Sequence, residues 1–459
     1  MLRKLLQSLA PRDFVAAVAV LAVAAYFGFT HAPRFQADAG FRVVGPHGEP
    51  LVVQLPELAK IPPLDLAAAC GKVAAHNARA RDLNRSAPDA EDDDDPARSI
   101  HKAAAAGCAD PAARNYAFYD ELGDILNDQS GASRFDADQL IAAMREALRA
   151  ASTSEDVTVT LKGLETRATY LGDPLHAPEF YLIGAELMAA HALFCSGEQA
   201  AECRVESHRR RGEALFDAGR WRADADLLRA GIAAYRVALR DVPEKSTAWI
   251  DLHTLIGSAL GQLSEQVDGR ARAGLLVEAL QEYVQARSAV DPSAEWTWAL
   301  INQNVCSIRQ PLAGINLDRA ETRLAIEECE KARVYYFARK QKTNEAAAHY
   351  NMARAYEKLA KWDQDEASAV QAVEHVRRTV ALYDEDGAVM SVAFARVHLA
   401  EALLDAGDFA KGRHEGERAQ ALLTDARQSL DAAEPVLRAA KAAGYLERLE
   451  AARRRLDVR

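Results

Sequence analysis

The chain lacks the short motifs that mark most catalytic and nucleotide-binding folds. It contains no Gly-x-Ser-x-Gly nucleophile elbow, no phosphate-binding loop and no dinucleotide-binding glycine fingerprint. Its six cysteines include no Cys-x-x-Cys pair, so neither a thiolate zinc site nor thioredoxin-like chemistry is indicated. We therefore predict no catalytic, metal or cofactor site.

Positive charge is also scarce relative to negative charge. The 459 residues include 56 Lys and Arg against 67 Asp and Glu, which gives a net charge of −11. No block of basic residues interleaved with aromatic ones appears, and phosphate-backbone binding normally requires such a block. Nucleic acid is therefore not predicted as a partner.

Long hydrophobic runs are rare, but one lies near the N-terminus. Residues 14–30 carry no charge, and as a helix they would span about 26 Å, enough to cross the hydrocarbon core of a membrane. Arg3, Lys4 and Arg12 precede the run, and basic residues favour the cytoplasmic side. We predict a transmembrane anchor at residues 1–31 of an inner (plasma) membrane protein, with the bulk of the chain in the periplasm or otherwise outside the cytoplasm.

A cleaved signal peptide is the alternative for this segment. Ala37 and Ala39 fit the small-residue pattern of a cleavage site, although they lie well beyond the end of the apolar run. Both interpretations export the chain, so disulfides are allowed. We predict one between Cys195 and Cys203, which flank a turn at 196–198, and we expect Cys306 and Cys329 to be small buried residues.

The region before the regular part of the chain is predicted to be heterogeneous. Residues 32–98 form a juxtamembrane region, with two short strands around a turn, a helix, and an acidic run at 86–96 that favours a solvated loop. Residues 99–203 are alanine-rich, and we predict divergent helical hairpins there.

The most informative feature is an internal repeat. The heptapeptides at 215–221, 356–362 and 403–409 each combine an apolar helix end, a small residue and an aromatic residue. Aligned small residues lie 45 to 49 residues apart and mark five repeats over 204–424: Gly212, Gly257, Cys306, Ala353 and Ala400. Repeats of this size bury their apolar faces by stacking, which predicts an all-α solenoid. Residues 425–459 are predicted to form helices that cap it.

These repeats resemble the tetratricopeptide repeat family in the apolar-small pair, the later Leu or Tyr, and the closing Trp221, Trp362 or Phe409. The resemblance covers about half of the chain, and the spacing is longer than the usual repeat of about 34 residues. In that family the first helices line a groove that binds protein segments. The resemblance therefore implies a peptide-binding face built from Arg209, Thr254, Ser258, Gln303, Asn304, Ser307, Tyr350, Asn351, Arg354 and Phe394.

The function expected from these features is that of a non-catalytic scaffold or adaptor, which binds protein or peptide segments for envelope assembly, secretion or maturation. Two alternatives stay open. One is an enzyme with its active site in residues 41–200 and the repeats as a recruiting arm. The other is a structural protein that assembles into homo-oligomers.

Overall fold

The computed structural model describes residues 40–458, with gaps at 47–48, 87–95, 130–132, 173–174, 176, 292 and 440–441. The chain divides into two compact units, Met1–Ala200 and Ala201–Arg459. The predicted anchor at 1–31, the cleavage pattern at 37–39 and nearly all of the acidic run lie outside the described residues. Among the residues that are described, no helix has the length and apolar character needed to cross a membrane.

The first unit opens with a two-stranded antiparallel sheet and continues as helices. Strand β1 (Gly40–Val44) pairs with β2 (Pro50–Gln54), with Phe41 opposite Val53. Phe41 is buried in the same core as the helices, which explains why so small a sheet persists. The helices are α3 (Pro56–Ala59), α4 (Leu66–Ser86), α5 (Lys102–Ala109), α6 (Tyr116–Gln129), α7 (Arg134–Ala150), α8 (Ser154–Gly172) and α9 (Pro178–His191), with 3-10 turns at Pro96–Arg98, Pro111–Ala113 and Ala192–Phe194.

Two ionisable side chains bind the backbone at the start of the short helix α3 and just after its end. The Glu186 carboxylate accepts the backbone N–H groups of Glu57 and Leu58, at 2.9 and 3.4 Å. The Arg145 guanidinium donates to the carbonyl oxygens of Ile61 and Pro62, at 2.6 and 3.2 Å. Burial raises the pKa of Glu186 to about 7, although the bonds from the two N–H groups oppose this.

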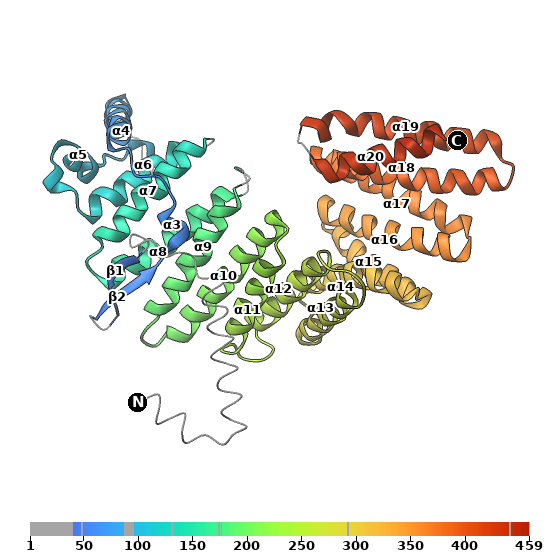
Figure 1. The fold of residues 1–459 in the computed structure, drawn as a ribbon, viewed down its shortest axis with the longest axis horizontal. Coiled ribbons are helices and arrows are strands. Elements are labelled where there is room, and N and C mark those ends of the chain that lie inside the picture. The colour runs from blue at the N-terminus through green and yellow to red at the C-terminus, as the bar shows by residue number, and fades with distance from the viewer. Residues whose placement is uncertain are drawn as a thin grey trace, which may run out of the picture. The chain divides into compact units, whose positions relative to one another are not determined.

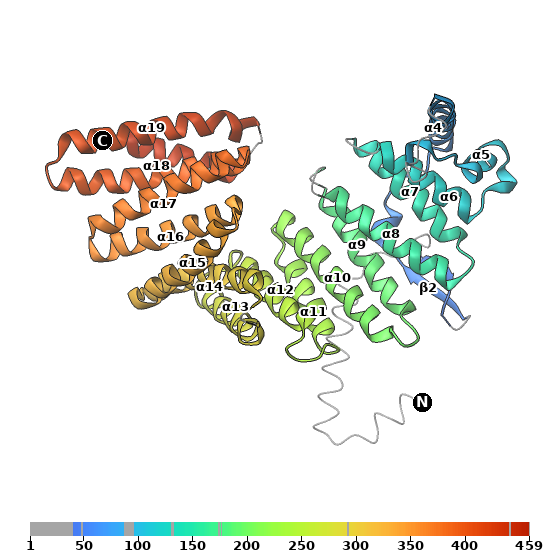
Figure 2. The same ribbon diagram turned by 180° about the vertical axis from the view of Figure 1, so that it is seen from behind.

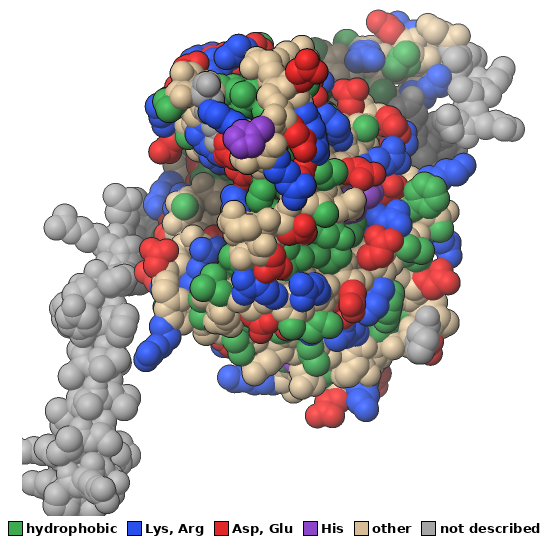
Figure 3. All heavy atoms as spheres, turned by 90° about the vertical axis from the view of Figure 1, so that its right-hand side faces the viewer, with side chains coloured by type: hydrophobic (Ala, Val, Ile, Leu, Met, Phe, Trp, Pro, Cys, Tyr) green, Lys and Arg blue, Asp and Glu red, His purple; other side chains and the backbone are tan. Residues whose placement is uncertain are grey.

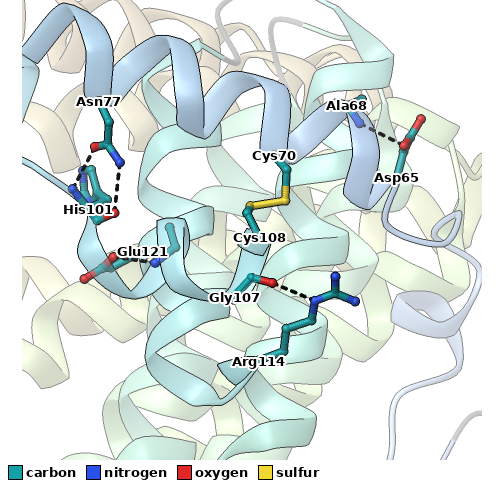
Figure 4. The surroundings of a disulfide bond; sticks show 10 residues. Asp65, Ala68, Cys70, Asn77, His101, Gly107, Cys108, Arg114 and Glu121 are labelled. Atoms are coloured by element: carbon teal, nitrogen blue, oxygen red, sulfur yellow. Dashed lines mark hydrogen bonds between the residues drawn. A yellow bond between two sulfur atoms is a disulfide. The ribbon is translucent and has the colours of Figure 1, made fainter. Parts of the chain in front are cut away.

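A disulfide between Cys70 and Cys108 joins α4 to α5 (Figure 4). Farther along α4, the Asn77 amide donates to the carbonyl oxygen of His101 and accepts from its N–H, at 3.1 and 3.0 Å. The disulfide closes a loop that spans 38 residues and includes residues 87–95. The chain on either side of that segment is thus held covalently and by hydrogen bonds.

The second unit is a succession of helical hairpins, each of a first and a second helix (Figures 1 and 2). Each hairpin contacts the next through its second helix, and first helices also contact one another, as α12 does α14, α14 does α16 and α18 does α20. The fold is therefore all-α and consistent with a solenoid. The helices are α10 (Ala200–Arg222), α11 (Ala225–Leu239), α12 (Thr247–Ser264), α13 (Gly269–Ala289), α14 (Glu295–Asn316), α15 (Arg319–Ala338), α16 (Lys342–Asp363), α17 (Glu366–Glu385), α18 (Val389–Gly412), α19 (Gly416–Ala439) and α20 (Ala443–Asp457).

The small residues that define the repeat lie where the two helices of a hairpin approach most closely. A Cβ atom added to Gly212 would be 2.5 Å from the ring of Tyr235 on α11, and one added to Gly257 would be 2.9 Å from the ring of Tyr283 on α13. Both tyrosines are almost fully buried. A side chain at these glycines would have to displace a packed ring, which costs about 1 to 3 kcal/mol.

The third hairpin has a covalent bond at the same position. Cys306 on α14 forms a disulfide with Cys329 on α15, 23 residues later, the same separation as between Gly212 and Tyr235. Cys306 and Cys329 are fully buried, as expected. The expectation that they are unbonded was wrong, because residues that face each other at the closest approach can also be bonded. Cys195 and Cys203 are each disulfide-bonded as well.

The turns inside three of the hairpins, α10–α11, α14–α15 and α16–α17, follow one pattern. A residue in the left-handed conformation precedes an aspartate whose carboxylate caps the second helix: Ala223 precedes Asp224, Leu317 precedes Asp318, and Gln364 precedes Asp365. Each aspartate accepts N–H groups from the first turn of the helix, which stabilises it by about 1 kcal/mol. Helix α19 continues to Ala439, across the predicted division at 424 and 425 between the repeats and the cap.

The raised pKa of Glu186 predicts that the first unit loses stability as the pH rises. An acid whose pKa is higher in the folded state stabilises the fold below its unfolded value of 4.5, and this contribution is lost as the pH passes about 7. We expect a decrease of about 2 to 3 kcal/mol in the free energy of unfolding between these pH values. The variant Glu186→Gln should remove most of this dependence.

The measurement is urea unfolding followed by circular dichroism. All five tryptophans lie in the second unit, so tryptophan fluorescence reports that unit separately and serves as an internal control. Glu179→Gln, on the same helix, should keep the pH dependence of the wild type. An equal slope in Glu186→Gln and wild type would show that Glu186 is not its origin.

Candidate functional site

The ten residues predicted to form a binding face all lie on first helices of the second unit, from α10 to α18. Arg354 is exposed and the other nine are half-buried, so none belongs to the fully buried core. We call this side of the first helices the first-helix face. The part on α10 and α12 differs from the part on α14 to α20 in how many of its polar side chains already have hydrogen-bond or ion-pair partners within the unit.

On α10 and α12 the predicted residues are engaged within the unit. Arg209 binds both carboxylate oxygens of Glu206 at 2.8 Å and also contacts Glu213. Burial raises the pKa of Glu206, but the bonds from Arg209 and Arg210 outweigh this and lower it to about 2. This half of the face therefore carries an internal ion-pair network.

The two hydroxyls predicted on α12 are likewise bonded inside the array. Thr254 donates to the carbonyl oxygen of Ile250 at 2.9 Å, and Ser258 donates to that of Thr254 at 3.0 Å. Ser258 also lies 2.9 Å from the hydroxyl of Tyr283, the ring that packs on Gly257. Thr254 and Ser258 thus have a structural role in the hairpin, whatever else they contact.

On helix α14, fewer of the polar side chains have hydrogen-bond partners within the described residues. Ser307 donates to the carbonyl oxygen of Asn304 at 2.7 Å. The Oε1 atom of Gln303 is buried and has no hydrogen-bond partner among the described residues. In the same described part of the chain, the amide side chains of Asn304 and Asn351 make no hydrogen bond. Amides in this state can still bind the main chain of a peptide, because they donate and accept at once.

The helices α16, α18 and α20 bring together rings and guanidinium groups. Arg354 lies over the ring of Tyr350, at 6.0 Å from its centroid, and Arg448 lies over the ring of Tyr445, at 5.3 Å. Phe394 stacks on Tyr445, with centroids 3.9 Å apart and planes 17° apart. We call Tyr350, Arg354, Phe394, Tyr445 and Arg448 the aromatic and arginine cluster.

Tyr445 and Arg448 were not predicted, because the C-terminal helices were taken to be a cap. The structure places α20 against α18 as a further first helix. A signal was present in the sequence, since Tyr350 and Arg354 lie four residues apart and Tyr445 and Arg448 lie three apart, both of which put the pair on one helical face. Glu401 holds Arg448 in place with two hydrogen bonds, at 2.5 and 3.2 Å.

Beside Arg354 lies a lysine in an unfavourable environment. The Lys358 amine donates to the carbonyl oxygen of Gln310 at 2.7 Å. Burial and, to a lesser extent, the positive charges of Arg354 and Arg272 together lower the pKa of Lys358 to about 7, although the charge of Glu357 opposes them. We call Arg272, Arg354 and Lys358 the cation cluster. Sequence reasoning missed Arg272 and Lys358, since neither is among the helix positions that the family resemblance assigns to the peptide-binding face.

An open cavity of about 620 Å³ lies between α15, α16 and α17, away from the cation cluster, and a pair of histidines lines it. The Nδ1 atoms of His349 and His375 are 2.7 Å apart, and the Tyr356 ring stacks on that of His375. Burial, and then the charge of His375, lower the pKa of His349 to about 3. The two imidazoles bond to each other, and no Ser, Thr, Cys or Lys side chain is among the described residues that line this cavity.

The alternative of an active site in residues 41–200 finds one strongly shifted carboxyl group in the described part of that range, Glu186. Its oxygens are used to hold α3, as described above. Asp120 also has a raised pKa, from burial first and the charge of Asp124 second, while Arg167 opposes both. Within the described residues, no hydrogen bond or ion pair joins the carboxyl group of Glu186 or Asp120 to a serine, threonine, cysteine or lysine side chain.

The environment of Lys358 predicts that removing its charge stabilises the second unit. When the pKa of a basic group is lower in the folded state, the free energy of unfolding of the protein decreases as the pH falls from 10.5 towards 7. We expect Lys358→Met to raise the free energy of unfolding at pH 7 by about 1 to 3 kcal/mol, and by less as the pH approaches 10.5.

Tryptophan fluorescence during urea unfolding measures this effect. Lys361→Met is the matched control, because Lys361 is on the same helix but exposed and paired with Asp405 at 2.9 Å. A loss of stability in Lys358→Met at pH 7 would contradict the assignment of an unfavourable charge.

Comparison with known proteins does not identify a family. No family model matches the chain, and no curated protein matches it. Similar solved structures include BtubC (BKLC) from P. vanneervenii (16% identity, TM-score 0.30, 64% of this chain and 94% of that chain) and a circular tandem repeat protein (14%, 0.28, 83% and 96%). Aspartyl phosphate phosphatase F from Bacillus subtilis is a third (13%, 0.37, 85% and 94%). These TM-scores are too low to carry an argument, so the fold assignment depends on the helix pairs themselves.

Proposed function

We propose that the chain is a non-catalytic scaffold that binds extended segments of other proteins on the first-helix face of its second unit. The observation that carries this proposal is the aromatic and arginine cluster, to which three successive first helices, α16, α18 and α20, each contribute. Half-buried rings beside guanidinium groups are typical of protein-binding surfaces, where aromatic residues and arginine supply most of the binding energy.

The contrast between the two halves of the face supports the same position. On α10 and α12 the polar groups are bonded to one another, whereas on α14 and α16 Asn304, Asn351 and Arg354 leave hydrogen-bonding capacity open. A bound segment gains most where it does not have to break existing bonds. We therefore place the binding region on α14 to α20.

We further propose that the scaffold acts outside the cytoplasm, anchored through residues 1–31 in the inner membrane. The disulfide bonding of all six cysteines supports an oxidising compartment. A scaffold in that location would serve envelope assembly, secretion or maturation. The anchor and the compartment come from the sequence.

Photo-crosslinking in intact cells tests the proposal. A benzophenone amino acid at Tyr350 should capture a partner protein, and one at Val370, a 39% exposed residue on the second helix α17, should not. Tyr350 and Val370 belong to the same hairpin, so folding defects would affect both probes.

Equal capture at both positions, or capture only from residues 40–200, would contradict a binding site on the first-helix face. If the captured protein is a second copy of this chain, the self-assembly alternative is supported instead of the adaptor.

A further inference from the structure

The charges of the second unit are mostly neutralised by ion pairs. Its arginines bind carboxylates across neighbouring hairpins, as Arg377 does Asp425 at 2.7 Å and Arg455 does Asp405 at 2.6 Å. On the face that Figure 3 shows, basic and acidic side chains are accordingly interspersed. The cation cluster departs from this rule, because within the described residues none of Arg272, Arg354 and Lys358 makes an ion pair.

We propose that the segment bound by the first-helix face is acidic, and that its carboxylates pair with Arg354, Lys358 and Arg272 while its aromatic or apolar side chains contact Tyr350, Phe394 and Tyr445. This inference rests on the proposed function and specifies the chemistry of the partner. A peptide with these properties supplies the ion-pair partners that the three cations lack among the described residues.

The positions of the three cations support a single anion subsite. Arg354 and Lys358 are four residues apart on α16, which places them on one side of that helix. Arg272 lies on α13, and its charge and that of Arg354 are near enough to oppose protonation of Lys358. The Nε atom of Arg272 is buried without a hydrogen-bond partner in the described part of the chain. Like charges held together in this way become favourable once an anion lies between them.

The nearby carboxylates lie against other side chains. Glu401 is bonded to Arg448, and the Oε1 atom of Glu357 lies 2.7 Å from Nε2 of His398, although this oxygen has no hydrogen-bond partner of good geometry within the described residues. His398 is in turn buried against the edge of Tyr350, with ring centroids 4.7 Å apart. These contacts fix the ring of Tyr350 and leave Arg354, which is exposed, directed to an external partner.

The rings and amides beside the cation cluster extend the match to a polypeptide. Phe394 and Tyr445 are half-buried and stacked, so they offer an apolar surface on one side only. Asn351, one residue after Tyr350, can bond main-chain groups of an extended segment. An anion alone would use the cations but would gain nothing from the rings.

Binding of designed peptides to the purified full chain tests this inference. Three labelled dodecapeptides share alternating Phe and Ser residues and differ only in carrying Glu, Gln or Lys at the remaining positions. We expect the Glu peptide to bind at least about tenfold more tightly than the Gln peptide, which corresponds to one or two charge-assisted hydrogen bonds. The Lys peptide should bind most weakly, and added salt should weaken the Glu peptide most.

Variants assign the effect to the cluster. Arg354→Gln and Lys358→Met should each weaken binding of the Glu peptide about fivefold or more and leave the Gln peptide nearly unchanged. Arg229→Gln, which removes an exposed arginine on α11 that pairs with Asp226, should have no effect. Because Lys358→Met is expected to stabilise the unit, its loss of binding could not be attributed to unfolding.

The possible outcomes separate this inference from the proposed function. If Gln or Lys peptides bind as tightly as the Glu peptide and crosslink through a probe at Tyr350, the face binds segments but the acidic specificity is refuted. If the Glu peptide binds and the variants do not weaken it, the cation cluster is refuted as its subsite. If no peptide crosslinks at Tyr350 and no cellular partner does either, the proposed function itself fails.

Discussion

The close approach of paired helices at one position, seen in the first three hairpins, determines the architecture of that part of the second unit. Gly212 and Gly257 leave room for the rings of Tyr235 and Tyr283, and Cys306 is bonded to Cys329. This contact fixes which side of each first helix faces its partner. It therefore also fixes which side remains on the first-helix face, where the proposed binding residues lie.

The repeat could be predicted because its signal is local and recurs. A small residue, a later aromatic residue and regular spacing together require closely packed helix pairs, whatever the rest of the sequence is. The disulfide between Cys306 and Cys329 was missed because each cysteine was judged by its own burial. Comparison with Gly212 and Tyr235 would have shown that the two cysteines face each other.

The proposed binding residues follow from the sequence only in part. Tyr350 and Arg354 follow from the repeat phase, and Phe394 was added to them as a candidate apolar contact. Tyr445 and Arg448 lie on α20, where the repeat motif is no longer recognisable. Arg272 and Lys358 depend on contacts between hairpins, because helix periodicity gives the direction of a side chain relative to its own helix and not the distance to charges on another. Spacing alone therefore predicts which positions share the first-helix face, but not which charges from neighbouring hairpins lie near them.

The first-helix face combines a saturated half with an open half. Arg209, Thr254 and Ser258 bond to their own helices, and Ser258 also to Tyr283, so the polar groups of α10 and α12 are engaged within the array. Helix α16 instead carries Arg354 and Lys358, which make no ion pair within the described residues, beside the rings of α16, α18 and α20. We expect the charge of Lys358 to lower stability and to favour an anionic partner. Such a trade of stability for binding is common at functional sites.

The equivalence of the hairpins is the central claim, and cysteines placed in the first hairpin test it most directly. If Gly212 and Tyr235 occupy the positions that Cys306 and Cys329 occupy in the third, the variant Gly212→Cys/Tyr235→Cys should form a fourth disulfide under oxidising conditions, detectable as a loss of two hydrogens in the intact mass. Gly212→Cys/Arg236→Cys, with the second cysteine moved by one residue to the exposed side of α11, should remain reduced. A reduced first variant, or equal oxidation of both, would contradict the account.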